Sequence, residues 1–283
     1  MRWQTSRFTL DLDRPLVMGI VNVTPDSFSD GGHFASTRAA LAHCEQLLRE
    51  GADILDVGGE STRPGIAPVS MEDELARVLP VVREAVKLGV PVSVDTYKAQ
   101  VMRQVLDLGA DIVNDVCALR QPGALDVVAA HPACAICLMH MHGEPRTMQR
   151  APMEGDAVPQ VLAFLRERSA VLRERGVAQD RICWDPGIGF GKTVAQNFAL
   201  LARQRELLAD GHVLLAGWSR KSSLGTVTGA PVHERVPASV AAALLAADRG
   251  ARVVRVHDVR ETVAALKVWG AMQSAAGPQE RST

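Results

Sequence analysis

Eight short runs of apolar, often β-branched residues recur along the chain, and segments with helical periodicity lie between them. The runs span residues 16–21, 53–57, 91–95, 111–115, 134–139, 181–185, 212–217 and 252–256. Their continuous apolar character is typical of parallel strands that are buried on both faces. The repeated βα unit therefore predicts the α/β class and favours a closed (β/α)8 TIM barrel over an open doubly wound sheet, although the strand count alone leaves both open.

The joints between helix and strand also repeat. Segments such as TRAALAHCEQLLREG and EDELARVLPVVREAVKLG end in a glycine, which tolerates the left-handed turn at a helix C-terminus. The tripeptide GAD follows at 51–53 and again at 109–111. A length of 283 residues fits one barrel, so we predict a single domain over 1–273 and a flexible tail over 274–283. Residues 1–12 are expected to form a small hairpin or strand outside the barrel.

Charge and cysteine content narrow the classes of partner. A formal net charge of −1 gives no global field that favours nucleic acid or an anionic membrane, so we expect a small-molecule partner. The CxxC at 134–137 lies in an apolar run that reads as a buried strand, where thiol exchange is disfavoured. The five cysteines form no recognisable disulfide framework, and the N-terminus does not read as a signal peptide. We expect a cytoplasmic protein.

Mostly polar side chains stand where the predicted strands end, which is where barrels of this type build active sites. They are Asn22, Asp56, Asp95, Asn114, Asp115, Met139, His140, Asp185, Ser219, Arg220, Lys221, Arg255 and His257. Asp95, Asn114 and Asp185 could converge on the barrel mouth, where a carboxylate accepts two parallel N–H bonds from an amino-heterocycle. The alternative is that each Asp or Asn only caps the following helix.

The basic residues indicate an anion site, since such barrels often bind phosphate in the loops after strands 7 and 8. Arg255 and His257 are two residues apart on an extended segment, so both could grip one anion. Alternatively, Arg220 and Arg255 pair with carboxylates at helix ends on the surface. Asn22 offers a neutral oxygen to Mg²⁺, which commonly binds through one protein group, phosphate oxygens and waters.

Three loops are rich in glycine. DPGIGFGKT at 185–193 looks like a phosphate-binding P-loop, but Pro186 occupies the position of the first glycine, and GIGFG lacks the GxGxxG spacing of a dinucleotide site. We predict that this loop is a mobile wall that presents Phe190. The loops at 22–34 and 58–65 are either lids or plain connectors.

Taken in order, the segments NVTPDSFSDGG, DVGGESTRPG, VSVDT, NDV, MHMHGEPRTMQ, DPGIGFGK, GWSRKS and RVHDVRET resemble the bacterial dihydropteroate synthase family over residues 15–271. The resemblance implies a pterin-binding barrel, usually a homodimer, with Mg²⁺ as cofactor. It also implies a cytoplasmic transferase of folate biosynthesis, which sulfonamides target.

The resemblance assigns roles by position. Residues for the pterin would be Asp95, Asn114, Met139, Asp185 and Lys221. Residues for the pyrophosphate would be Asn22 through Mg²⁺, Arg63, Arg255 and His257. Residues for p-aminobenzoate would be Phe28, Thr62, Arg63, Pro64, Phe190, Lys221 and Ser222. The catalytic group would be Asp95, Lys221, Arg255 and His257.

The implied reaction condenses 6-hydroxymethyl-7,8-dihydropterin pyrophosphate with p-aminobenzoate, giving 7,8-dihydropteroate and pyrophosphate. Two other functions would fit a pterin-binding barrel. A pterin-dependent methyltransferase shares the Asp, Asn, Asp pattern but gives no reason for Arg255, His257 and the STRP segment. A catalytically silent paralogue should have lost part of one substrate site, whereas Phe28, Thr62 and Arg63 are present.

Overall fold

The structure is a computed structural model that describes residues 1–24, 32–61, 67–144, 147–148 and 150–275. Its parallel strands form a closed barrel in the order β10-β3-β4-β5-β6-β7-β8-β9. The barrel strands are β3 (Leu16–Asn22), β4 (Ile54–Gly58), β5 (Val92–Asp95), β6 (Ile112–Asp115), β7 (Ala135–Met139), β8 (Ile182–Asp185), β9 (Val213–Ala216) and β10 (Val253–Val256). Each strand begins and ends within one residue of its predicted run, so the predicted (β/α)8 barrel is confirmed.

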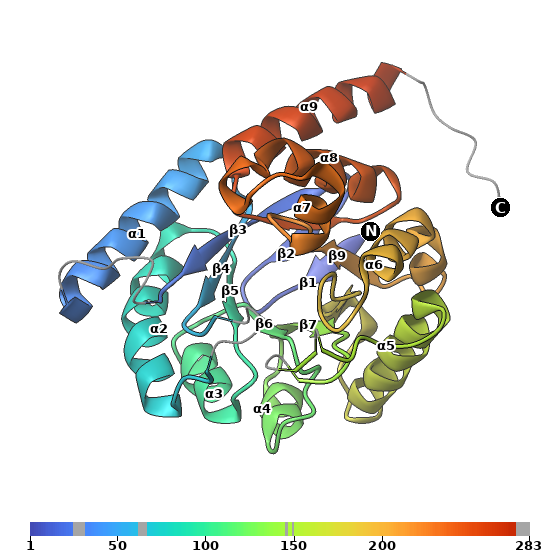
Figure 1. The fold of residues 1–283 in the computed structure, drawn as a ribbon. Coiled ribbons are helices and arrows are strands. Elements are labelled where there is room, and N and C mark those ends of the chain that lie inside the picture. The colour runs from blue at the N-terminus through green and yellow to red at the C-terminus, as the bar shows by residue number, and fades with distance from the viewer. Residues whose placement is uncertain (25–31, 62–66, 145–146, 149, 276–283) are drawn as a thin grey trace.

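Helices surround the strands, as the view along the barrel in Figure 1 shows. They are α1 (Gly32–Glu50), α2 (Met71–Ala85), α3 (Ala99–Asp107), α4 (Ala124–Ala130), α5 (Ala157–Glu174), α6 (Val194–Ala202), α7 (Ser222–Thr228), α8 (Val236–Asp248) and α9 (Val259–Ala275). Short 3-10 turns are η2 (Val86–Leu88), η3 (Gln179–Arg181), η4 (Gln204–Leu208) and η5 (Val232–Glu234). None of the helices in the described ranges is long and apolar enough to cross a membrane.

Local sequence explains several helix boundaries. The hydroxyl of Ser70 accepts the N–H of Asp73 and caps α2, and Thr193 forms a reciprocal capping box with Gln196 at the start of α6. Both GAD joints follow a helix, and Gly51 and Gly109 have φ of +102° and +97°, which a side chain would strain. The predicted joints are therefore confirmed.

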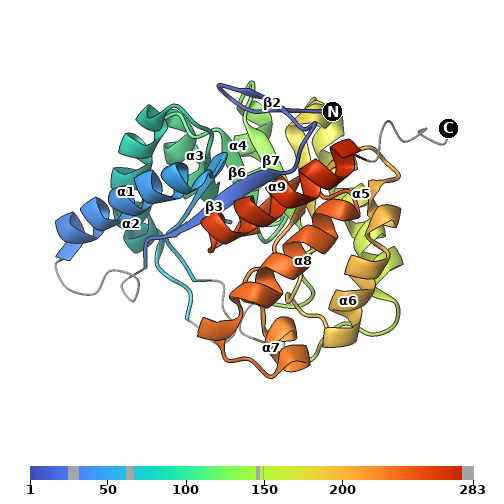
Figure 2. The ribbon, with the colours of Figure 1, turned by 90° about the horizontal axis from the view of Figure 1, so that it is seen from above.

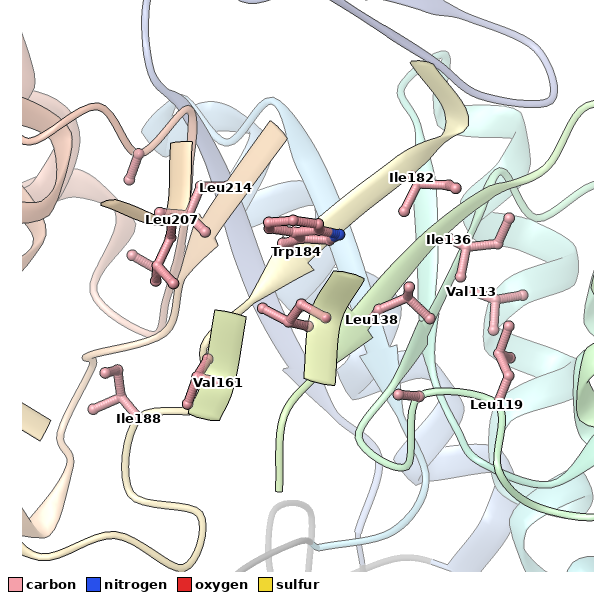
Figure 3. Packing of buried hydrophobic residues seen from close by; sticks show 14 of the residues in the cluster. Val113, Leu119, Ile136, Leu138, Val161, Ile182, Trp184, Ile188, Leu207 and Leu214 are labelled. Carbon is pink, nitrogen blue, oxygen red and sulfur yellow. The ribbon is translucent and has the colours of Figure 1, made fainter. Parts of the chain in front are cut away.

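Apolar side chains fill the space between the strands and the helices. Figure 3 shows the larger cluster, in which Trp184 on β8 lies among residues such as Leu138 and Leu214 of the neighbouring strands. The buried indole N–H of Trp184 donates to the hydroxyl of Ser169 on α5 at 2.6 Å. This packing keeps β7, β8 and β9 in fixed register beneath the loops that follow them.

The N-terminal residues form the predicted hairpin, with β1 (Arg2–Gln4) antiparallel to β2 (Thr9–Asp11). Trp3 of this hairpin is 0 % exposed and packs with Leu16, Met18 and Ile54, the inward side chains of the barrel. Its indole N–H donates to the carbonyl of Arg181 at 3.3 Å. Figure 2 shows the hairpin at one end of the molecule and α7 at the other. The cluster around Trp3 therefore closes the end of the barrel opposite the loops that follow the carboxyl ends of the strands.

The C-terminal boundary differs slightly from the prediction. Helix α9 continues through Ala275, so the expected junction between residues 273 and 274 falls inside its last turn. The remaining tail, 276–283, lies outside the described residues.

Candidate active site

A cavity of about 920 Å³ lies at the carboxyl ends of the barrel strands. Most of the predicted site residues line it together: Asn22, Asp95, Asn114, Met139, Asp185, Phe190, Lys221, Ser222, Arg255 and His257. The other predicted positions, Phe28, Thr62, Arg63 and Pro64, lie outside the described residues. The structure therefore brings the predicted positions that it describes together around one cavity, and the roles assigned to them stay predictions.

Strand register explains why these side chains meet. Asp95 on β5 is paired with Asn114 on β6, and Met139 on β7 is paired with Asp185 on β8. Side chains at paired positions of adjacent parallel strands point to the same face, which here is the barrel interior. Four of the residues predicted to bind the pterin thus form two adjacent pairs.

Adjacent residues on a strand point to opposite faces, and this separates Asn114 from Asp115. The Asp115 carboxylate accepts the backbone N–H groups of Cys117 and Leu119, each at 2.7 Å. It therefore holds a tight turn, in which Ala118 and Leu119 have positive φ. Asp115 therefore stabilises its own turn and does not cap the following helix, α4, whose N-cap residue is Gly123.

Arg255 lies between two carboxylates inside the barrel. Its Nε donates to Asp56 Oδ2 at 2.6 Å, and its Nη2 donates to Asp95 Oδ2 at 2.8 Å. Burial acts to lower the pKa of the guanidinium, but the charges of Asp56 and Asp95 raise it above its usual value. Sequence reasoning expected Arg255 either at a free anion site or in a surface ion pair, whereas the structure shows a bridge between two strand-end carboxylates.

For Arg220 the ion-pair alternative holds. Its guanidinium binds Asp258, just before α9, with contacts of 3.1 and 2.5 Å. Its backbone N–H donates to the hydroxyl of Ser239 at 2.9 Å, and its φ is +58°. Arg220 still lines the cavity, but its charge is already shared with a carboxylate.

His257 is held by Ser219. The Ser219 oxygen accepts the backbone N–H of His257 at 3.1 Å and lies 2.9 Å from its Nδ1. Burial first, and then the charges of Arg255 and Arg220, lower the pKa of His257 to about 3. The imidazole is therefore neutral at physiological pH, where a Ser219 hydroxyl that donates to Nδ1 leaves the ring proton on Nε2.

Burial changes the acidity of two carboxyl groups that line the cavity, Asp95 and Asp185. It raises the pKa of Asp95 to about 7, although Arg255 opposes this shift. It also raises the pKa of Asp185, against the N–H of Gly187 that donates to Asp185 Oδ1 at 2.7 Å. A ligand that donates N–H groups to these carboxylates favours their ionised forms.

Lys221 provides a cation opposite these acids. Burial lowers its pKa to about 8, and the charge of Asp185 partly offsets this. The ammonium lies 4.2 Å from the centre of the Phe190 ring, within cation–π range. Lys221 and Phe190 together make one wall of the cavity, and Phe190 presents its ring there as predicted.

The loop 185–193 does not act as a phosphate cradle. Several of its backbone N–H groups already have acceptors: Gly187 donates to Asp185, Gly189 donates to Asn197 Oδ1 at 2.9 Å, and Phe190 donates to the Gly187 carbonyl at 3.0 Å. The rejection of a P-loop from its spacing agrees with this geometry. The predicted mobility of the loop stays a prediction, and these bonds act against it.

Sequence reasoning listed Asp56 at a strand end without giving it a role, and it missed Glu60 and Arg235. Asp56, 0 % exposed, accepts Arg255 and also the amide N–H of Asn114 at 3.3 Å. Glu60 and Arg235 line the cavity. Glu60 accepts the Tyr97 hydroxyl at 2.9 Å and pairs with Lys98, whereas Arg235 donates to the carbonyls of Ala230 and Arg220. Only Asp56 had a clear signal, its inward position on β4.

Metal ligands are sparse. Within the described ranges there is no cluster of three or more His, Cys, Asp or Glu side chains suited to a metal ion. Asn22, half-buried at the end of β3, lines the cavity and offers one neutral oxygen. This donor set fits an ion that brings most of its ligands with a phosphorylated substrate, and does not fit a permanently bound one.

Known proteins share this fold and sequence over nearly the whole chain. The family model described as "Pterin binding enzyme" matches residues 18–257. The dihydropteroate synthase of Neisseria meningitidis serogroup B is 53% identical over 95% of this chain and 97% of its own. The structure of the Burkholderia cenocepacia enzyme complexed with 7,8-dihydropteroate has a TM-score of 0.89 at 50% identity, covering 97% of each chain.

A third relative adds a drug complex. The Yersinia pestis dihydropteroate synthase, solved with a sulfonamide drug complex, has a TM-score of 0.91 at 45% identity and covers 97% of this chain and 100% of its own. Fold, site and identity agree, and this chain belongs to the dihydropteroate synthases, within the family of pterin-binding enzymes.

Proposed function

We propose that this chain is a transferase that joins 6-hydroxymethyl-7,8-dihydropterin pyrophosphate to p-aminobenzoate. The reaction breaks the bond between the pterin CH₂ carbon and the pyrophosphate oxygen. It forms a bond from that carbon to the aniline nitrogen, which loses one proton. The main support is identity of 50% over 97% of the chain to a solved relative that holds 7,8-dihydropteroate, the product of this reaction.

The inward acids suit the pterin half. Asp95 and Asp185 line the same cavity, and Asn114 between them provides both donor and acceptor groups. Met139 and the wall of Lys221 over Phe190 offer apolar and polarisable surface for a flat ring. We assign the pterin to this part of the cavity, with Lys221, Phe190 and Ser222 at its border with p-aminobenzoate.

The contact between Asp95 and Arg255 supports a mechanism by charge separation. When the carbon–oxygen bond breaks, positive charge develops on the pterin and negative charge on the pyrophosphate. A carboxylate and a guanidinium 2.8 Å apart can stabilise both charges at once, with His257 as a neutral hydrogen-bond donor to the leaving group. No protein nucleophile is required, because the aniline nitrogen attacks directly and the site chiefly positions it.

Mg²⁺ belongs to the leaving-group side of this proposal. Asn22 would contribute one ligand to it, and the substrate's phosphate oxygens and waters would supply the others. When bound, the ion neutralises charge on the pyrophosphate as it leaves.

Pyrophosphate release by the purified chain tests the proposal. It should require the pterin pyrophosphate and Mg²⁺, increase with p-aminobenzoate, and yield 7,8-dihydropteroate. Binding of the pterin without release would favour a silent paralogue. Transfer of a methyl group from a pterin instead would favour the methyltransferase. Given the drug complex of the Yersinia pestis relative, we also propose that a sulfonamide competes with p-aminobenzoate here.

We further propose that the chain is a homodimer in the cytoplasm. Apart from Met1, every strongly exposed large hydrophobic side chain in the described part of the chain lies between α7 and α9: Val227, Val232, Leu245, Val268 and Met272. Helices α7, α8 and α9 are neighbours in both views of the ribbon (Figures 1 and 2). Leu245 of this face belongs to the alanine-rich segment 238–247, whose alanines at 242, 243, 246 and 247 are buried within the protein. Exposed apolar patches of this kind commonly lie in subunit interfaces. All five cysteines are unpaired, which suits a reducing compartment.

Sedimentation velocity tests the dimer. The wild type should sediment as a dimer, and Leu245→Glu should shift it to a monomer, because burying the new carboxylate in an apolar interface is costly. Thr9→Glu at an exposed position of the N-terminal hairpin is the control and should leave the sedimentation coefficient unchanged. A monomeric wild type would contradict the dimer.

A further inference from the structure

Lys192 is a buried cation that the proposed reaction does not use. It ends the loop after β8 and is only 2 % exposed. None of the ion pairs within the described ranges includes it, and burial lowers its pKa to about 7. A lysine this deep needs acceptors for its N–H groups, because an unsatisfied buried ammonium is strongly unfavourable.

The acceptors of Lys192 are three backbone carbonyls. Its Nζ lies 3.2 Å from the His140 oxygen, 2.9 Å from the Gly187 oxygen and 3.2 Å from the Phe190 oxygen. An ammonium has three N–H donors and no acceptor, so the number of donors matches the number of carbonyls. One of these carbonyls follows β7 and two belong to the loop after β8, so the side chain ties two segments together.

The two segments already touch through their backbones. The N–H of His140 donates to the Asp185 carbonyl at 3.0 Å. A Cβ at Gly187 would stand 1.8 Å from the His140 oxygen, and a Cβ at Gly191 would stand 2.1 Å from the His142 oxygen. This close approach requires glycine at both positions and leaves no space for the loop to settle closer to β7.

The tied loop carries groups that face the cavity. Asp185 is held by the Gly187 N–H at 2.7 Å, and the carbonyl of Gly187 is one of the three that Lys192 binds. Phe190, whose carbonyl is another, places its ring 4.2 Å from the Lys221 ammonium. A shift of the loop would therefore move a carboxylate on the pterin side and an aromatic wall on the p-aminobenzoate side together.

We propose that Lys192 is a positioning residue for catalysis: by fastening the loop 186–191 to the end of β7, it sets the places of Asp185 and Phe190 for both substrates. This inference rests on the proposed function. Lys192 acts through these two residues and touches neither substrate itself. It also accounts for the lysine that makes this loop look like a P-loop.

The chain contains a matched control at the other end of the same strands. Arg181, 7 % exposed just before β8, donates to the carbonyls of Cys134, Pro132 and His131 at 2.8, 3.1 and 2.9 Å. It is also a buried cation that ties the β7 and β8 segments through three carbonyls. It lies away from the cavity, at the end that the hairpin closes.

The experiment compares Lys192→Met with Arg181→Met. Both variants lose three hydrogen bonds to buried carbonyls, so both should melt at a lower temperature than the wild type. Well below those temperatures, Lys192→Met should raise the Kd of the pterin pyrophosphate and the KM of p-aminobenzoate about tenfold or more and lower kcat about 10- to 100-fold. Arg181→Met should leave all three within about twofold of the wild type. Lys192→Gln, which keeps two donors, should lie between.

Each outcome decides the question. A wild type that makes no dihydropteroate rejects the proposed function. An active wild type with Lys192→Met kinetics equal to those of Arg181→Met rejects the positioning role alone. If neither Lys192 variant folds while Arg181→Met does, Lys192 serves stability and the proposal is wrong.

Discussion

Truncation of Trp3 should separate the stability of the barrel from its activity. The side chain is 0 % exposed and packs against the inward residues of the barrel, at the end away from the cavity. Trp3→Ala should cost about 3–5 kcal/mol of the free energy of unfolding from lost burial and the void left behind. Loss of the indole bond to the Arg181 carbonyl adds about 1 kcal/mol.

For a chain of this size, the combined loss of about 4–6 kcal/mol corresponds to a fall in Tm of roughly 8–24 °C. Thermal unfolding followed by circular dichroism measures this shift. The control is Phe8→Ala on the same hairpin, whose half-buried ring lies 5.1 Å from the guanidinium carbon of Arg7. It should lower Tm by only a few degrees, since surface changes rarely exceed about 0.5–1 kcal/mol.

The activity of the Trp3→Ala variant should not change. At about 25 °C, where the variant remains folded, its kcat and both of its KM values should match those of the wild type. An unchanged Tm would show that the hairpin does not stabilise the barrel. A raised KM in folded protein would show that the closed end communicates with the cavity, and the separation of roles argued here would be wrong.

Two predictions concern the site itself. Asp95→Ala should lower kcat/KM for the pterin pyrophosphate by about 10²–10³-fold, because it removes the carboxylate beside the developing charge. Cys137→Ala, at a buried position below the cavity, should lower only Tm. Full activity of the Asp95 variant in the pyrophosphate-release assay would contradict the mechanism. The pH profile of kcat/KM should rise as pH increases through about 7, where Asp95 ionises, and fall through about 8, where Lys221 loses its proton. Lys221→Arg should abolish the alkaline limb, and an alkaline limb that persists in this variant would exclude Lys221 as its source.

The sequence predicted the fold closely because each strand carries its own signal. Continuous apolar runs mark the strands, glycines mark most of the joints before them, and parallel closure then brings the strand ends to one place. Asp95, Asn114 and Asp185 could be located for this reason before any contact was known. Alternation along β6 also predicts that Asn114 faces inward and Asp115 outward, which position at a strand end alone does not reveal.

The partners of the charged groups could not be predicted in the same way. Arg255 pairs with Asp56, 199 residues away, and with Asp95, 160 residues away. Such pairs depend on how far each side chain reaches across the barrel, and no local pattern records that distance. The partners of Lys192 could not be predicted either. A lysine in a glycine-rich loop suggests an exposed phosphate ligand, whereas Lys192 points into the protein and donates to backbone carbonyls.

The bridge from Arg255 to Asp56 and Asp95 implies thermodynamic linkage between the two halves of the pterin substrate. On the proposed assignment, the pyrophosphate competes with Asp56 and Asp95 for the Arg255 guanidinium. When the guanidinium moves away from Asp95, N–H groups of the pterin ring replace it as hydrogen-bond donors to that carboxylate. Each half of the substrate thus lowers the free-energy cost of binding the other. A fragment with only the ring, or only the pyrophosphate, would have to disrupt the bridge without help from the other half. The intact molecule should therefore bind more tightly than the affinities of its parts predict. For the same reason, pyrophosphate is readily released once its bond to the pterin is broken.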